Sequence, residues 1–138
     1  MRHLLSIAYD KQHLASVRTF VREVLLTYKI SEIQIYQLVL AIDEICANLI
    51  IHSQNCNEHR SFELEIEVIP DRQILFLLRD DGDAFDITKY CTPELEEIIT
   101  AGRKGGMGLI LVKRIMDNIE FSKEKNHNIC RLVKNITN

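Results

Sequence analysis

Hydrophobic positions in the first half of the chain recur at the spacing of helices. Residues 3–9 are largely apolar, and we expect them to form an opening strand. Steps of three and four residues then separate Leu14, Val17, Val21, Val24 and Tyr28, and the same steps separate Leu38, Ile42, Ile45 and Leu49. The pattern predicts two helices, each with one buried face.

Polar residues mark where the predicted helices begin. Asp10 is placed to cap the first helix, and Ser31 with Gln34 forms a capping-box pattern at the start of the second. We expect the second helix to end near Ser53, before the polar run 54–60. The sequence Thr92-Pro93-Glu94 predicts a short helix, and a further helix is expected over 109–116.

The second half of the chain has the patterns of strands. From Phe62 to Ile69, apolar residues alternate with glutamates, which predicts a strand with one buried and one solvated face. A turn is expected at 70–72, and the wholly apolar stretch 74–78 predicts a central strand buried on both faces. Residues 119–121 and 129–133 are expected to form a closing hairpin. The predicted fold class is α+β: a two-layer α/β sandwich with a mixed, mostly antiparallel sheet and helices on one face.

Length and composition narrow the class of protein. The 138 residues suit one domain, 1–138, and 46% hydrophobic with 27% charged residues is typical of a soluble globular domain. With a net charge of -3, the totals show no excess of basic residues of the kind that nucleic-acid binding requires, and we expect no direct nucleic-acid partner. The apolar stretch 38–51 is interrupted by Asp43, Glu44 and Asn48, and no signal peptide is recognisable, so we expect a cytoplasmic protein without a membrane segment.

The cysteines show no metal-ligand spacing. We interpret them as reduced thiols; they are Cys46, Cys56, Cys91 and Cys130. A zinc site at His52, Cys56 and His59 is a weaker alternative, because a second pair of ligands is missing.

Three polar clusters could carry chemistry, and the first lies on the second helix. Glu44 and Asn48 are four residues apart and share a helix face beside the apolar stripe. An Asn oxygen can ligate Mg²⁺, and a Glu can accept a proton. Taken alone, the pair is better explained as part of a solvated helix face, because Glu and Asn at this spacing are common in helices.

The second cluster, 80–86, follows the most apolar strand. Asp80 at a strand end can accept a hydrogen bond from an adenine amino group, and Gly82 would let the backbone approach the base. An acidic β-turn is the alternative. An EF-hand is excluded, because Gly82 has the wrong offset and no helix is expected to end at Asp80.

The third cluster, 102–108, contains four glycines together with Arg103 and Lys104, and a helix is expected behind it. Free N–H groups and the positive end of the helix dipole would both face an anion such as a phosphate. The sequence is neither a Walker A motif nor a Rossmann fingerprint. A plain flexible loop is the alternative.

The order and spacing of the three clusters resemble those of the GHKL ATPases, the superfamily of gyrase and the histidine kinases. Glu44-x-x-x-Asn48 resembles its N box, and two glycine boxes are matched by Asp80-x-Gly82 and Gly105-Gly106-x-Gly108-Leu109. Within this superfamily the chain is similar to the serine-kinase anti-sigma branch, through Asp80-x-Gly82-x-x-Phe85-Asp86, and through Gly105-Gly106-Met107-Gly108-Leu109 followed by Met116-Asp117.

The resemblance implies a role for each matching residue. Glu44 would be the general base, Asn48 would ligate Mg²⁺, and Asp80 would read the adenine of ATP with Gly82 and Phe85 beside it. The nucleotide phosphates would contact the glycine segment; its residues are Gly105, Gly106, Met107, Gly108 and Leu109. The segment 92–104 would be a lid in which Arg103 or Lys104 neutralises the γ-phosphate.

The same resemblance implies partners. Members of the family phosphorylate a serine of an anti-anti-sigma protein and sequester a sigma factor. The resemblance also implies a homodimer. Two departures from the family pattern are Ala84, where the superfamily has a second glycine, and Ser53, where the family often has glycine. Neither departure removes a catalytic group.

Three hypotheses follow for the activity. The first is an ATP-dependent protein serine/threonine kinase that also acts as an anti-sigma factor, and the retained Glu44 favours it. The second is a nucleotide-gated switch that binds its partner without phosphoryl transfer. The third, the catalytic domain of a histidine kinase, would need a helical segment with a phosphoacceptor histidine, for which 138 residues leave no room.

Overall fold

The computed structural model describes residues 2–8, 10–52, 61–80, 105–124 and 127–136. Their helices and strands follow one another in the order that the sequence predicts. In chain order they are β1 (Arg2–Ala8), the 3-10 turn η1 (Lys11–His13), α1 (Leu14–Leu26), α2 (Glu32–His52), β2 (Ser61–Ile69), β3 (Gln73–Asp80), α4 (Gly105–Ile115), β4 (Asn118–Glu124) and β5 (His127–Asn135).

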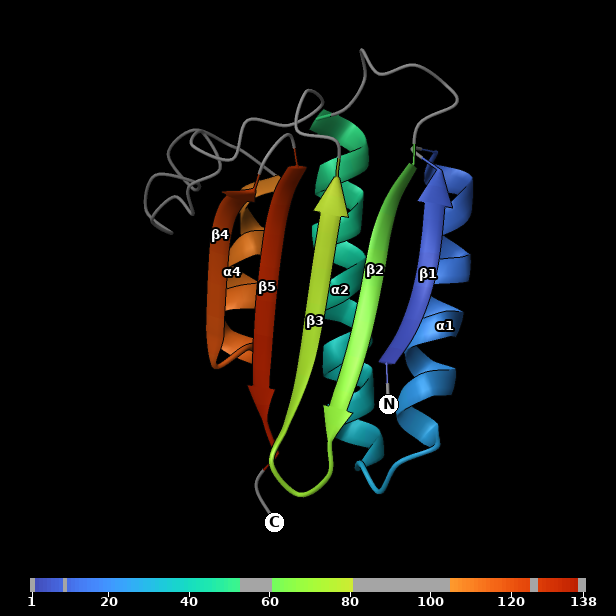
Figure 1. The fold of residues 1–138 in the computed structure, drawn as a ribbon, viewed down its shortest axis with the longest axis vertical. Coiled ribbons are helices and arrows are strands. Elements are labelled where there is room, and N and C mark those ends of the chain that lie inside the picture. Colours follow the sequence, from blue (N-terminus) through green and yellow to red (C-terminus); the bar gives the residue numbers. More distant parts are fainter. Residues whose placement is uncertain (1, 9, 53–60, 81–104, 125–126, 137–138) are drawn as a thin grey trace.

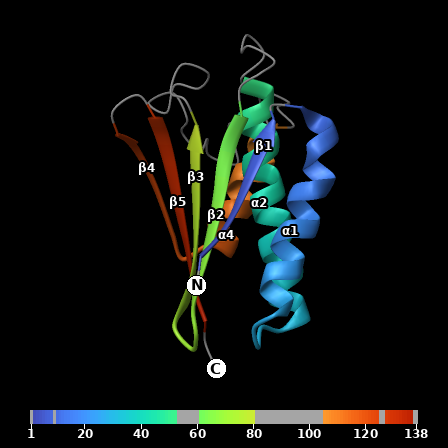
Figure 2. The same cartoon turned by 45° about the vertical axis from the view of Figure 1, so that its right-hand side comes forward.

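The five strands form one sheet in the order β1-β2-β3-β5-β4. Every neighbouring pair is antiparallel, so no parallel pair of the expected mixed sheet occurs among the described strands. The three described helices lie on one face of the sheet, with α2 between α1 and α4 (Figures 1 and 2). The predicted two-layer α+β sandwich is therefore confirmed.

The core fills the space between the helices and the sheet. Alternate residues of each strand point toward the helices, as the period of two predicts for β2. The largest fully buried side chains come from α1, α2 and the three central strands: Leu25, Ile35, Leu38, Ile42, Phe62, Leu64, Ile66, Ile74, Phe76, Leu78 and Leu132. Both predicted helical stripes face this core.

The expectation that residues 74–78 are buried on both faces is wrong. In β3, Ile74, Phe76 and Leu78 are buried under the helices, whereas Leu75 and Leu77 are only half-buried. The reason is that all three described helices cover the same face of the sheet. The opposite face, which we call the open face, carries Leu75 and Leu77 as an apolar strip.

The helix starts follow the predicted caps with one change. Ser31 Oγ accepts a hydrogen bond from the backbone N–H of Gln34 at 3.2 Å, which confirms the cap of α2. Asp10 Oδ1 accepts from the N–H of Gln12 at 3.0 Å, so this side chain caps the turn η1 instead of α1 itself. The helix α2 runs at least to His52, as expected.

The helix α2 is the central helix of the core. Residues Glu32–Ile50 are long and apolar enough to cross a membrane by length and composition, but half of that stretch is buried inside the fold. Its apolar character is thus used in packing against the sheet. Cys46 on this helix and Cys130 on β5 are buried free thiols, and burial raises the pKa of Cys130 to about 12. Cys56, Cys91 and His59 lie outside the described residues.

Packing of α2 should dominate the stability of the fold. Ile42 is fully buried, and we expect Ile42→Ala to lower the free energy of unfolding by about 2–5 kcal/mol, since it removes apolar contacts and leaves a cavity. Ile33→Ala on the same helix is the matched control. Ile33 is 73% exposed, so its effect should stay within about 0.5 kcal/mol. Urea denaturation of the two variants measures both values, and equal losses would contradict this view of the core.

Candidate nucleotide site

The buried polar side chains of the described residues gather at one end of the sheet. They are Asn48, Asp80 and Asn128, which are 8%, 3% and 4% exposed. The C-terminal end of α2, the end of β3 and the start of β5 all lie at this end, as does the start of α4 (Figure 1). Buried polar groups are costly unless they have a partner, so such a group of three marks a candidate site.

Asn48 and Glu44 are brought together by one turn of α2. The Asn48 Nδ2 donates a hydrogen bond to the backbone carbonyl of Glu44 at 2.8 Å. This bond occupies the amide nitrogen and fixes the carboxamide, so its oxygen remains as the ligand group for a cation. The geometry therefore fits the predicted metal-binding role of Asn48, which stays a prediction.

The Glu44 carboxyl is half-buried at the edge of the same helix face. Desolvation by burial, followed by the nearby charge of Asp43, raises its pKa above the usual 4.5. Arg18 on α1 forms an ion pair with Asp43 at 3.0 Å, which holds Asp43 to the α1 side of α2. A carboxylate with a raised pKa is a better proton acceptor than a fully solvated one.

Asp80 lies at the inner face of β3, beside a residue that the sequence interpretation missed. The register pairs Asp80 with Asn128 of β5, so both side chains point to the helix side of the sheet. Asn128 is followed at alternate positions by Cys130 and Leu132, both buried. An inward-facing Asn in that alternation was the available signal, but the inner face could not be assigned until the register was known.

The end of β3 is held by His127. The Nδ1 atom of His127 lies 3.1 Å from the backbone oxygen of Asp80. This contact joins the last residue of β3 to the first residue of β5. The position of the Asp80 side chain is thus supported both by the sheet pairing and by a side chain from the neighbouring strand.

The glycine segment begins a helix earlier than expected. We predicted a loop to 108 and a helix from 109, but α4 starts at Gly105. Gly105, Gly106, Met107 and Gly108 therefore form its first turn, and their N–H groups are those that a helix leaves without intrahelical acceptors. The earlier start strengthens the anion-binding interpretation, because the positive end of the helix dipole also lies at this turn.

Part of the predicted site lies outside the described residues. This holds for Gly82, Phe85, Arg103 and Lys104, for the proposed lid 92–104, and for the predicted helix at Thr92. The roles of Met107 and Leu109 also stay predictions, since only their backbone is described. The structure places Asn48, Asp80 and the start of α4 at the same end of the sheet, with Glu44 one helical turn before Asn48.

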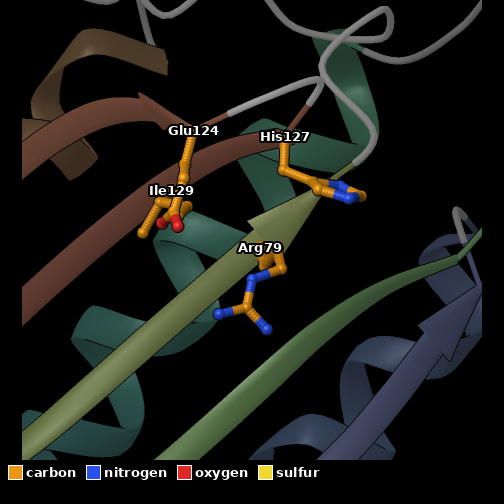
Figure 3. Close-up of a pocket in the computed structure, with 4 residues that line it drawn as sticks. All are labelled: Arg79, Glu124, His127 and Ile129. Atoms are coloured by element: carbon orange, nitrogen blue, oxygen red, sulfur yellow. The ribbon is translucent and has the colours of Figure 1, made fainter.

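A separate pocket of about 260 Å³ lies near the same end of the sheet. It is lined by Arg79, Glu124, His127 and Ile129 (Figure 3). Arg79 precedes Asp80 in β3, so its side chain points to the open face, whereas that of Asp80 points to the helices. This pocket is consequently not the candidate nucleotide site.

The sheet is antiparallel and is covered by helices on one face. Buried Asn and Asp residues lie at the same end of the sheet as a helix that begins with glycines. This combination is typical of histidine kinase-like nucleotide-binding domains. The chain belongs to this family: residues 7–134 match the histidine kinase-like ATPase domain. This match confirms the resemblance seen in the three motifs, and ATP binding is the property that defines such domains.

Curated relatives carry the name serine-protein kinase RsbW. The protein from Oceanobacillus iheyensis is 28% identical over 94 residues, which cover 65% of this chain and 59% of the relative. The protein from Staphylococcus aureus is 29% identical over 90 residues, covering 62% of this chain and 56% of the relative. The matched region thus spans less than two thirds of each relative.

Solved structures confirm the fold. The RsbU and RsbW domains of a Mycobacterium tuberculosis protein align over 97% of this chain and 32% of theirs, with a TM-score of 0.69 and 13% identity. A chain of the SiaB-SiaC complex from Pseudomonas aeruginosa aligns over 97% of this chain and 88% of its own, with a TM-score of 0.66 and 12% identity.

The pairing of Asp80 with Asn128 leads to a prediction for nucleotide affinity. Asp80→Asn should weaken ATP binding by about 1.5–3 kcal/mol, the scale of a lost hydrogen bond to a charged group. Asn128→Ala should cost about 0.5–1.5 kcal/mol, as for a neutral hydrogen bond. Ser122→Ala, at an exposed position of β4, is the control and should change nothing. Isothermal calorimetry gives the affinities, and an unchanged value for Asp80→Asn would remove Asp80 from the adenine site.

Proposed function

We propose that this chain is an ATP-dependent protein serine/threonine kinase that acts as an anti-sigma factor. The observation that carries the proposal is the position of Glu44, half-buried and one helical turn from the buried Asn48. Nucleotide binding alone does not require a proton acceptor there. Transfer of a phosphoryl group to a hydroxyl usually does.

Each residue of the candidate site has a part in the proposed reaction. Asp80, with Asn128 beside it, orients the adenine, and the first turn of α4 receives the phosphates. The Asn48 oxygen, left available by the 2.8 Å bond of its amide nitrogen, would hold Mg²⁺, which neutralises charge on the phosphates when bound. Glu44 accepts the proton of the attacking hydroxyl. Arg103 or Lys104 would add positive charge at the γ-phosphate.

The proposed partners follow from the relatives. The curated relatives are named serine-protein kinases, and one similar structure is solved as a complex of two proteins. We propose an anti-anti-sigma protein as the serine substrate and a sigma factor as the sequestered partner, in the cytoplasm and without direct contact to nucleic acid or membrane. A non-catalytic switch gated by nucleotide is the competing proposal.

A homodimer is part of the proposal, and the open face of the sheet is the surface that favours it. Leu75 and Leu77 on β3 and Val133 on β5 are half-exposed there, and no described helix covers them. Burying such a strip against its equivalent in a second copy would remove apolar surface from water.

Glu44 separates the kinase from the non-catalytic switch. Glu44→Gln keeps the shape of the side chain but removes its basicity. We expect ATP affinity within about 1 kcal/mol of the parent and a transfer rate lower by about 10²–10⁴-fold. The acceptor protein is first identified by a pull-down with this chain from the cell extract, in the presence of ATP or ADP, and by its labelling. The measurement is then the rate of label transfer from γ-labelled ATP to that acceptor.

Asn48→Ala is the comparison for this experiment. It should lose both ATP affinity and transfer, because Asn48 would hold the Mg²⁺ that offsets the charge of the phosphates. Transfer at the parent's rate by Glu44→Gln would rule out the general base. A parent that binds its partner but labels nothing would favour the switch.

The raised pKa of Glu44 predicts the pH dependence of transfer. A base acts when deprotonated, so the rate should rise with pH through the pKa of Glu44, and this acid limb should lie above pH 4.5. Asp43→Asn removes a charge that raises this pKa, so the limb should move to lower pH. Arg18→Gln keeps the charge of Asp43, so it should not move the acid limb to lower pH. If Asp43→Asn leaves the limb unmoved, the limb belongs to a group other than Glu44.

A further inference from the structure

The helix α2 carries a second apolar face on the side turned away from the sheet. Ile33 and Tyr36 are 73% and 67% exposed, and the half-exposed Leu40 follows one turn later. At 3.6 residues per turn the three side chains point within roughly 60° of one another and away from the buried stripe. We call Ile33, Tyr36 and Leu40 the outer stripe.

Neither folding nor nucleotide binding requires the outer stripe. The solvent side of a helix in a globular domain normally carries polar residues, and clustered exposed apolar side chains mark interaction sites. At 67% exposure, Tyr36 alone leaves on the order of 100–170 Å² in contact with water. The N-terminal turns of α2 extend beyond the shorter α4, so α4 does not cover them (Figure 1).

Little net charge interrupts the stripe along α2. Asp43 is the next outward-facing position after Leu40, and its charge is paired with Arg18 of the neighbouring helix at 3.0 Å. Glu44 then follows on the same side of the helix. An apolar surface therefore leads from the N-terminal turns of α2 to the carboxyl group that we propose as the general base.

The size of a protein interface connects the stripe with Glu44. At 1.5 Å per residue, Tyr36 lies about 12 Å and Ile33 about 17 Å from Glu44 along the helix axis. A typical interface covers about 800 Å² on each partner, which corresponds to a disc of about 16 Å radius. A folded protein that presents a hydroxyl group at Glu44 with such a footprint would cover much of the outer stripe, whereas a small-molecule acceptor would not.

We propose that the outer stripe is the docking surface for the protein substrate. The occupant is a folded protein with an apolar patch about 12–17 Å from the serine or threonine hydroxyl that it presents to Glu44. This inference rests on the proposed kinase function, since it takes the phosphoacceptor to be a protein. Ile33 and Tyr36 determine which acceptor is bound, and they take no part in the chemistry.

The test is a comparison of steady-state transfer by three proteins: the parent, the double variant Ile33→Ser/Tyr36→Ser, and the control Leu4→Ser. Leu4 is 59% exposed but lies on edge strand β1, on the other side of the sheet from α2, and Glu65 of β2 separates it from Leu77 in the apolar strip of the open face. With the purified acceptor, the double variant should raise KM by roughly 10- to 100-fold, as loss of two interface anchors predicts, with kcat within about twofold of the parent. ATP affinity and the urea midpoint should remain those of the parent.

Cross-linking identifies the occupant independently of catalysis. Tyr36 is replaced by photoreactive p-benzoylphenylalanine, the chain is irradiated in its own cell extract, and the same replacement of Leu4 serves as the control. We expect an adduct at position 36 whose second component is the protein that becomes labelled from γ-labelled ATP. An adduct with the mass of two copies of this chain, or with a protein that is never labelled, overturns the proposal.

The two experiments separate failure of docking from failure of the kinase function. Equal KM values for the parent and the double variant overturn the docking surface and leave the kinase function standing. If the parent labels no protein, the kinase function fails. An adduct at position 36 then shows a docking surface for a different kind of partner, and the absence of an adduct shows none, so the substrate-docking proposal is overturned in either case.

Discussion

The packing of α2 against the sheet is the interaction on which the rest of the structure depends. Its inner stripe, with Leu38, Ile42 and Ile45 fully or almost fully buried, fixes the rotation of the helix about its own axis. Once that rotation is fixed, the direction of every other position on the helix follows. Asn48 then lies beside the inner stripe and is buried near the end of α2, Glu44 lies one turn earlier toward the outer side and is half-buried, and Ile33 and Tyr36 face water. One packing interface thus determines the candidate metal ligand, the candidate base and the proposed docking surface together.

Much of this arrangement could be predicted from the sequence, because it depends on local periodicity. The stripes of α1 and α2, the alternation of β2 and the cap at Ser31 all report the environment of single elements. The prediction for 74–78 was wrong because an apolar run does not say how many layers cover a sheet. Leu75 and Leu77 have the same character as residues buried on both faces, and only the placement of all three described helices on one side leaves them half-exposed.

The site was predictable to a similar degree, and its gaps have the same physical origin. Glu44 and Asn48 could be paired because a helix makes i and i+4 neighbours. Asn128 was missed because it becomes a neighbour of Asp80 only through the pairing of β3 with β5, between residues 48 positions apart. The predicted start of α4 was four residues too late, because glycine is unfavourable in the interior of a helix. In the first turn, where the N–H groups are free to bind an anion, glycine is tolerated.

The proposed docking surface and the candidate nucleotide site would lie on different halves of α2. Its C-terminal half contributes Asn48 to the buried end of the core, where polar groups are held by local hydrogen bonds and burial raises the pKa of Glu44. The outer side of its N-terminal half is exposed to water and is not part of the core. The apolar side chains of Ile33 and Tyr36 therefore cost the fold little, provided that they do not cause non-specific association with other molecules. Because a helix is rigid over this length, a protein bound at the N-terminal half would be held at a fixed distance from Glu44. Selection of the acceptor and proton transfer would then depend on different residues of the same helix, so either could change without loss of the other.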